Sequence, residues 1–327
     1  MTVGATITRL FKFCRFPELW VALLAGLCFL LFPEYLSFAT SVFVTATFVL
    51  SLDLVLGFAG VVTLGHALFF GCGAYAAGLI SIYGWDEPIS IAVAAAAVGA
   101  IVALVTGPFV LRLRELPLLM VTLALGAIAF EAANKATWLT GGDDGLVGIE
   151  FKPVLGAFEW TLSSKTAYFY ALAWLCICLY LARRIVNSPF GLAVIGVREN
   201  FRRMALLGAP VQSHLLRIYM ISGAMAALAG ALSTETARFV GLSVLSVETS
   251  IAALVMLVVG GVGRLYGALI GTVAYMVVHH VAAQINPYHW MFVIGGLLVA
   301  VVMYARGGLL GLAETLAGSV RRTRGAR

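Results

Sequence analysis

Long apolar runs separated by short polar stretches make up most of this chain. The runs approach the roughly 20 residues that a helix needs to cross the hydrocarbon core of a bilayer. They do not alternate apolar with polar residues, as the strands of a membrane barrel do. The pattern predicts ten helical spans, at residues 19–33, 38–58, 63–82, 89–111, 116–137, 166–182, 215–236, 249–262, 265–284 and 290–305.

Some of these runs are irregular enough to change the count. The run 249–262 is short, and the runs 63–82 and 265–284 are rich in glycine, so a broken or re-entrant helix could replace a full span. The first run follows a basic stretch but lacks a small-x-small cleavage site, and we expect a retained helix there. The expected fold is an all-α polytopic membrane protein of about ten transmembrane helices, forming a single transmembrane domain over residues 1–327.

Composition indicates that lipid is the main solvent of the chain. Hydrophobic residues make up 62% of it and charged residues 11%, with a mean hydropathy of +1.02, whereas soluble domains carry about 25% charged residues. The cysteines are Cys14, Cys28, Cys72, Cys176 and Cys178. Cys176 and Cys178 could form a disulfide or bind a metal, but small buried hydrophobic side chains are the simpler interpretation, and we expect no metal site.

Basic residues predict the orientation. If both termini are cytoplasmic, only Lys135, Lys152, Lys165 and Arg238 face outward, and the other 17 of the 21 Lys and Arg residues face the cytoplasm. Such a bias is typical of cytoplasmic loops. It assigns 1–18, the segment 183–214 and the basic tail 306–327 to the cytoplasm, and the loop 138–165 to the periplasm. The net charge of +6 then reflects topology and attraction to anionic lipid, with no need for nucleic acid.

Two glycine-rich stretches lie within the expected spans. In LVLGFAGVVTLGHALFFGCGAYAAGLI, residues 54–80, the small residues would let helix backbones approach closely, and His66 is the polar side chain deep in the pattern. His66 either hydrogen-bonds a neighbouring helix, the simpler interpretation, or lines a solute path. In SVETSIAALVMLVVGGVGRLYGALIGTVAY, residues 246–275, a glycine cluster indicates close packing or a helix break. The positions assigned to packing or gating are Gly57, Gly60, Gly65, Gly71, Gly260, Gly261 and Gly263.

A third motif, LTGGDDGLVGI, lies in the expected outer loop at residues 139–149. Gly141 and Gly142 can supply tight turns. Asp143 and Asp144 lack the ligand spacing of a calcium loop. We expect a structured turn that faces a periplasmic partner.

The fourth motif, SPFGLAVIGVRENFRRMALLGAP, occupies residues 188–210 in the expected cytoplasmic segment. Asn187 or Ser188 can cap a short helix that has Pro189 at its first position. The next apolar positions recur with helical spacing: Val197, Phe201, Ala205 and Gly208. This predicts one amphipathic helix of about 11 residues over 197–208, ended by Gly208 and Pro210.

Among acids within the expected spans we single out Asp53 and Glu131. A charge at the centre of a spanning helix costs about 2.5–3.5 kcal/mol, so an intramembrane acid is a functional candidate by default. Asp53 lies in the inner third of its span, and Glu131 lies in the outer third near Asn134 and Lys135. Snorkelling or pairing within the bundle would explain either acid without a role in transport.

These four motifs, in this order, resemble the permease family of branched-chain amino acid ABC importers, specifically its M-type subunit, from about residue 38 to 312. The resemblance implies a bundle in the bacterial inner membrane that works with an H-type permease subunit, two ATP-binding-cassette ATPases and a periplasmic solute-binding protein. ATP and Mg would be bound by the ATPases, with no cofactor in this chain. The solute would be a branched-chain or other amino acid, with urea, short amides or aromatic acids as alternatives.

The resemblance also implies roles for individual residues. The coupling helix that docks on the ATPase would include Arg198, Glu199, Asn200, Phe201, Arg202, Ala205 and Gly208. The translocation path could include Asp53, His66, Glu131 and Asn134. The outer turn with Gly141, Gly142, Asp143 and Asp144 would meet the binding protein. A secondary carrier or channel would not need a coupling helix, and an intramembrane enzyme would need catalytic residues at one depth, which we do not expect.

Overall fold

The computed structural model describes residues 33–153 and 165–285, together with residues 21, 25, 26, 29, 292, 295, 296, 298, 299, 303 and 307–311 of the two end regions. The described residues are largely helical, and their extended pairing is limited to one bridge between Leu146 and Val240. The all-α membrane fold is therefore confirmed. The expected spans 19–33 and 290–305 fall mainly outside the described residues, and a total of ten spans stays a prediction.

Six of the described helices are long and apolar enough to cross a membrane. They are α3 (Leu36–Leu52) with its π-helical continuation η2 (Asp53–Phe58), α5 (Pro88–Val110), α6 (Glu115–Lys135), α8 (Lys165–Val186), α11 (Val211–Ala237) and α13 (Leu265–Ile285). Shorter elements are α4 (Ala67–Ile82), α7 (Thr137–Thr140), α9 (Pro189–Glu199), α10 (Phe201–Leu206), α12 (Val247–Gly260), and the 3-10 turns η1 (Pro33–Tyr35), η3 (Gly142–Asp144) and η4 (Leu242–Leu245).

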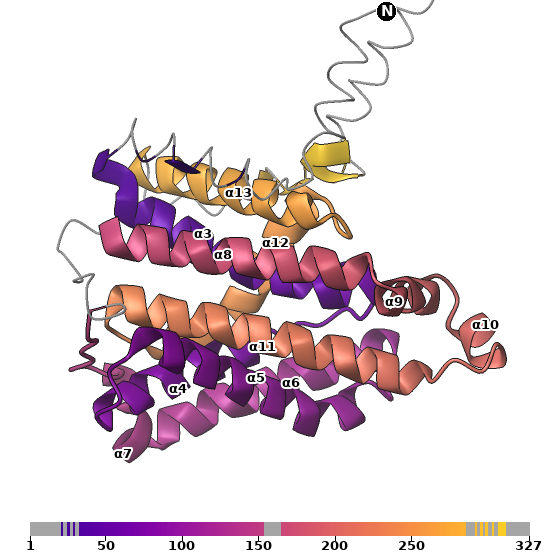
Figure 1. The fold of residues 1–327 in the computed structure, drawn as a ribbon, viewed down its shortest axis with the longest axis horizontal. Helices are drawn as coiled ribbons and strands as arrows, with labels where there is room; N and C mark the ends of the chain where they lie inside the picture. Colours follow the sequence, from indigo (N-terminus) through magenta and orange to yellow (C-terminus); the bar gives the residue numbers. More distant parts are fainter. Residues whose placement is uncertain are drawn as a thin grey trace, which may run out of the picture.

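Helix α11 lies at the centre of the bundle and packs against α3, α4 and α5 (Figure 1). Small residues make this packing possible. A β-carbon at Gly73 would overlap the backbone of Ala227, and one at Gly230 would overlap the carbonyl of Phe70. Helices in lipid associate through such close packing, because lipid tails are as apolar as the side chains and there is no hydrophobic driving force for association.

Two helices, α4 and α12, are shorter than a membrane-spanning helix and begin in the middle of the bundle. They have 16 and 14 residues, too few to cross about 30 Å at about 1.5 Å per residue. The Ala67 N–H, at the start of α4, donates to the Ser250 hydroxyl in the first turn of α12 at 2.8 Å. From this meeting point α4 runs to the end where the Ser81 hydroxyl donates to the Glu150 carbonyl. Helix α12 runs the other way, toward the end of η2.

Irregular backbone precedes both helices, so the runs 63–82 and 249–262 hold shorter helices, α4 and α12, in place of full-length ones. Residues 59–66 precede α4, and residues 238–246, with η4, precede α12. Non-helical backbone is tolerated at this depth where protein covers it and supplies partners. Here the Leu64 N–H donates to the Thr122 hydroxyl of α6 at 3.3 Å. The expectation of a broken helix is thus supported at 63–82 and 249–262, whereas the glycine-rich run 265–284 forms the continuous helix α13.

The longer connections between the helices gather at the two ends of the bundle. Helix α7 lies at one end of the long axis, and α9 and α10 lie at the other (Figure 1). The described part of 138–165 and the 183–214 segment therefore lie at opposite ends of the bundle, while their assignment to periplasm and cytoplasm stays a prediction.

Candidate functional site

The segment between α8 and α11 is built from two short helices. Ser188 caps α9, because its hydroxyl accepts the Gly191 N–H at 3.2 Å, and Pro189 follows as the first helical residue. Of the two predicted capping residues, Ser188 is thus the correct one. After α10, Gly208 adopts a φ of +81° and Pro210 precedes α11, so the predicted end of the helical segment is also confirmed.

The prediction of one continuous helix over 197–208 is wrong. The backbone leaves the helical conformation at Asn200, with φ −154° and ψ 95°. The Asn200 side chain then accepts the Arg203 N–H at 2.9 Å and starts α10 as a new helix. Asparagine is a preferred capping residue, and its side chain competes with the continuous helix here.

Helix α10 projects beyond the ends of the long helices (Figure 1). Its last residue, Leu206, is 89% exposed, and Leu207 is 72% exposed. Arg202, Ala205 and Gly208 are exposed as well. Phe201 and Met204 pack against the core, and the Arg114 guanidinium, at the turn between α5 and α6, lies over the Phe201 ring, 3.3 Å from its centroid.

Arg198, in the last turn of α9, is exposed like Glu199 beside it, but its guanidinium reaches the bundle. The Arg198 Nη1 donates to the Gly57 carbonyl near the end of η2. The same side chain lies against Gly60 and Gly263, where added β-carbons would meet its Cγ at 2.8 Å and its Nη1 at 2.9 Å. Arg198 thus contacts other parts of this chain, and its assignment to ATPase coupling stays a prediction.

Asp53 joins the same group of residues. Its carboxyl is fully buried, and Oδ1 accepts the Gly263 N–H at 2.7 Å in the turn between α12 and α13. A β-carbon at Gly57 would overlap both this carboxylate and Gly263. The structure thus brings five residues together at two backbone turns, one after η2 and one between α12 and α13: Asp53, Gly57, Gly60, Gly263 and Arg198. Of the two explanations for Asp53, the observed contact is pairing within the bundle.

His66 belongs to a separate buried cluster. Its Nε2 lies 2.9 Å from the Ser51 hydroxyl of α3 and 3.5 Å from the Ser222 hydroxyl of α11. Each serine has one hydroxyl proton, and the two protons go to the carbonyls of Phe48 and Ser51, both at 2.6 Å. His66 Nε2 must therefore carry the proton and donate it to Ser51. This is the hydrogen bond to a neighbouring helix that the simpler interpretation expects, while a path role for His66 stays a prediction.

Glu131 and Asn134 lie apart from both clusters, near the outer end of α6. Glu131 is exposed and pairs with Lys135 one turn later, with Oε1 3.4 Å from Nζ. An exposed pair of this kind contributes about 0–1 kcal/mol. The four residues predicted to line a path are therefore not brought to one place by this chain.

The sequence reasoning missed a third acid within the spans. Glu235 lies in the last turn of α11 and is fully buried. The Tyr170 hydroxyl of α8 is the polar group next to its carboxyl. Glu235 falls inside the predicted span 215–236, so an acid near the end of an otherwise apolar run was the signal available.

At the outer end, the predicted turn is present. Gly141 and Gly142 have φ of +75° and +60°, and Asp143 and Asp144 are exposed on η3. Beside this turn, the antiparallel bridge ties Leu146 to Val240, with the Leu146 N–H donating at 2.8 Å.

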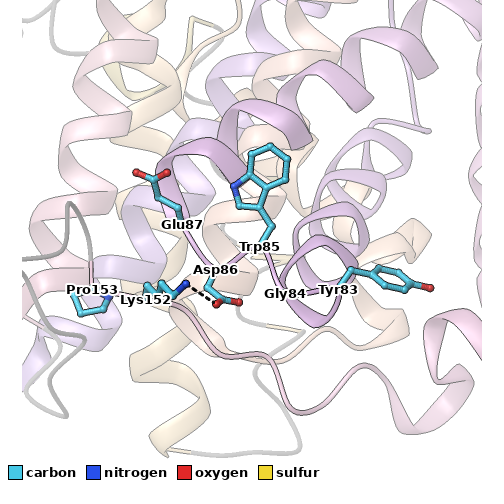
Figure 2. Close-up of a pocket in the computed structure, with 7 residues that line it drawn as sticks. All are labelled: Tyr83, Gly84, Trp85, Asp86, Glu87, Lys152 and Pro153. Carbon is cyan, nitrogen blue, oxygen red and sulfur yellow. Dashed lines mark ion pairs between the residues drawn. The ribbon is translucent and has the colours of Figure 1, made fainter.

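A shallow hollow of about 680 Å³ opens at the same end. Figure 2 shows the Lys152 ammonium turned toward Asp86, 3.3 Å from Oδ2, while the Tyr83 ring points away from the other lining residues. Tyr83 is 80% and Trp85 is 61% exposed, as is common for aromatic residues at a membrane–water interface.

The remaining glycines singled out in the sequence also stand at close contacts. A β-carbon at Gly65 would overlap Thr122, and one at Gly71 would overlap Leu245. Gly260 packs against the backbone of Gly267, and Gly261 has a φ of +115° in the turn between α12 and α13. The assignment of these glycines to packing is supported, while gating stays a prediction.

Within the described part of the chain, no group of three or more His, Cys, Asp or Glu side chains could hold a metal ion. The cysteines described there, Cys72, Cys176 and Cys178, form no disulfide with one another. Cys178 is buried in the apolar core, as the simpler interpretation expects.

These features define a polytopic helical membrane protein with one projecting two-helix segment, and comparison with known proteins identifies the family. The model of the family described as "Branched-chain amino acid transport system / permease component" matches residues 34–302, so this chain belongs to that family. The resemblance predicted from the four motifs is thereby confirmed.

The similar proteins are M-type permeases. The chain is 28% identical over 283 residues to the high-affinity branched-chain amino acid transport system permease protein LivM of Salmonella typhimurium, covering 80% of this chain and 66% of that protein. It is 28% identical over 287 residues to LivM of Escherichia coli, with the same coverage. A probable LivM of Methanocaldococcus jannaschii is 26% identical over 113 residues, 34% of this chain and 32% of that protein. The chain thus spans 66% of the length of the first two relatives. No solved structure matches.

Proposed function

We propose that this chain is the membrane-spanning permease subunit of an ATP-binding-cassette importer in a bacterial inner membrane. The observation that carries the proposal is the exposed α10 at the arginine-rich end of a chain that belongs to a permease family. The sequence contains no G-x-x-x-x-G-K-[ST] phosphate-binding loop, so the energy for uptake would come from another chain. Helix α10 would dock on that chain.

The names of the relatives support a proposal for the cargo. Their names refer to branched-chain amino acids, and we propose the same solutes, or other amino acids, for this chain. A periplasmic binding protein would deliver the solute to the outer turn at Asp143 and Asp144. An H-type permease subunit would complete the path, and two ATPases would bind below. Urea, short amides and aromatic acids are the alternative solutes.

Reconstitution tests the proposal. The chain, an H-type partner, the ATPases and the binding protein are placed in liposomes, and uptake of labelled leucine is measured with and without ATP. We expect accumulation only in the complete mixture with ATP. Accumulation by this chain alone, driven by protons or sodium, would make it a secondary carrier and contradict the proposal.

A surface variant tests where the ATPase binds. Leu206→Asp places a charge on a side chain that is 89% exposed, so folding should be unaffected. Burying a leucine at an interface contributes about 1.5–3 kcal/mol, so co-purification of the ATPase should fall at least about tenfold, since 1.4 kcal/mol is a factor of ten. Tyr83→Asp, at an exposed aromatic residue of the opposite end, is the control and should keep the ATPase bound.

A further inference from the structure

Arg198 connects three parts of the chain that are far apart in sequence. It belongs to α9, its Nη1 donates to the Gly57 carbonyl, and it lies against Gly263 in the turn between α12 and α13. Gly57 lies next to the end of η2, where the chain leaves the helix and turns back into the bundle. Arg198 therefore contacts two backbone turns at this end of the bundle, one that follows η2 and one between α12 and α13.

The surroundings of Arg198 are shaped to admit its side chain. Gly60 and Gly263 have φ of +73° and +77°, backbone conformations that favour glycine. A β-carbon at either position would come within 3.0 Å of Arg198. The Asp53 carboxyl accepts a hydrogen bond from the Gly263 N–H, so η2 and the turn between α12 and α13 are also joined directly to each other.

We propose that Arg198 is the positioning residue that transmits movement of the α9–α10 segment to the two backbone turns beside Gly57 and Gly263. The proposal rests on the proposed function, because it requires an ATPase to move α10. Asn200 joins α10 to α9 by capping, so a displacement of α10 acts on the last turn of α9, where Arg198 is. A change in the Gly57 contact shifts the start of residues 59–66, and these lead to α4 and the bundle centre.

The first experiment uses the assembled complex. In the assembled complex, Arg198→Ala should reduce leucine uptake about tenfold. The ratio of hydrolysis with solute-loaded binding protein to basal hydrolysis of the same variant should fall by a similar factor, within the usual range of coupling between sites. Arg198→Lys keeps one donor and should retain part of the stimulation. Arg217→Ala, at an exposed arginine in the first half of α11, is the matched control and should retain all of it. Full stimulation and uptake in Arg198→Ala would overturn the proposal.

The second experiment needs no ATPase and so separates this inference from the proposed function. Val262→Cys, in the turn between α12 and α13, is introduced into a cysteine-free chain and labelled with a maleimide. Because loss of Arg198 removes a contact with this turn, the labelling rate should rise about tenfold in Arg198→Ala, as for a local opening made about 1.4 kcal/mol easier. It should stay unchanged in Arg217→Ala. An unchanged rate in Arg198→Ala would show that Arg198 does not hold the turn.

A double-variant cycle shows whether Gly60 acts through Arg198. Gly60→Ala should mimic Arg198→Ala in the stimulation assay, because its β-carbon would displace the arginine. Combined with Arg198→Ala, it should add little further loss, because residues in contact give non-additive effects. Two fully additive losses would mean that Gly60 acts only through its own backbone, against the proposal.

Discussion

At the scale of single residues, Asp53 shows how a buried acid can stabilise a turn. Its carboxyl is fully buried, and the partner found for it is the backbone N–H of Gly263, 210 residues further along the chain. Hydrogen bonds between a carboxylate and a backbone N–H are short and strong. Asp53 thus fixes the turn between α12 and α13 against η2, whatever further part it has in transport.

Removal of this carboxyl should destabilise the protein. Asp53→Ala leaves the Gly263 N–H without its acceptor, which costs about 1–3 kcal/mol for a buried group. Asp53→Asn keeps an acceptor oxygen and should lose less. Thermal unfolding of the purified protein in detergent measures both. Glu131→Gln removes an exposed ion pair and should change stability by less than about 1 kcal/mol, so an equal loss in all three variants would contradict this role of Asp53.

Sequence reasoning located the residues of the site better than it located their partners. Asp53 stood out because an acid in an apolar run is rare. Its contact with Gly263, and that of Arg198 with Gly57, join residues separated by 210 and 141 positions. Periodicity and spacing describe only neighbours along a helix, so neither pairing could be predicted. Glu235 was missed because an acid at the last position but one of a predicted span looks like a boundary residue.

At the scale of elements, the structure differs from the sequence prediction in the helix expected over 197–208 and in the length of α4, and both differences have local causes. The apolar spacing of Val197, Phe201 and Ala205 is continuous across Asn200, so periodicity alone predicts one helix. The capping preference of asparagine was the competing signal, and it prevailed. For α4, the predicted run begins at residue 63, inside the irregular segment 59–66, because much of that segment is also buried and apolar.

Close packing between helices gives a prediction at this scale. Gly73→Ala should destabilise the bundle, because the added carbon overlaps the Ala227 backbone in α11, and overpacking typically costs about 1–3 kcal/mol. Gly126→Ala should be neutral or slightly stabilising, because its β-carbon would meet only Gly65, at 3.8 Å, and alanine favours a helix. The amount of folded protein in membranes, measured by fluorescence size-exclusion chromatography, compares the two. A reversed order would contradict the packing described for α4 and α11.

At the scale of the whole molecule, the two ends differ in charge. In the described part, the α9–α10 end carries Arg183, Arg184, Arg202, Arg203 and Arg217, whereas the opposite end carries Lys135, Lys152, Lys165 and Arg238. The structure places these groups at opposite ends, as the sequence analysis predicts, and the basic bias assigns the α9–α10 end to the cytoplasm.

Labelling of intact cells checks this orientation. In a cysteine-free chain, Glu150→Cys should react with a membrane-impermeant maleimide added outside, because the residue is exposed at the end that carries α7. Ser213→Cys, exposed at the start of α11, should react only after the cells are opened. The amount of each variant in the membrane is compared with that of the native, cysteine-containing protein to confirm normal expression. Reaction of Ser213→Cys from outside would reverse the topology.

The short helix α4 has a consequence for the order in which the bundle assembles during synthesis. A newly made segment enters the membrane readily when it offers about 20 apolar residues in helical form, and α4 offers 16 after an irregular stretch. The helix that covers α4 is α11, which begins at Val211. We therefore expect the contacts of α4 with α11 to form only after the ribosome has produced α11, so that the centre of the bundle closes late in synthesis.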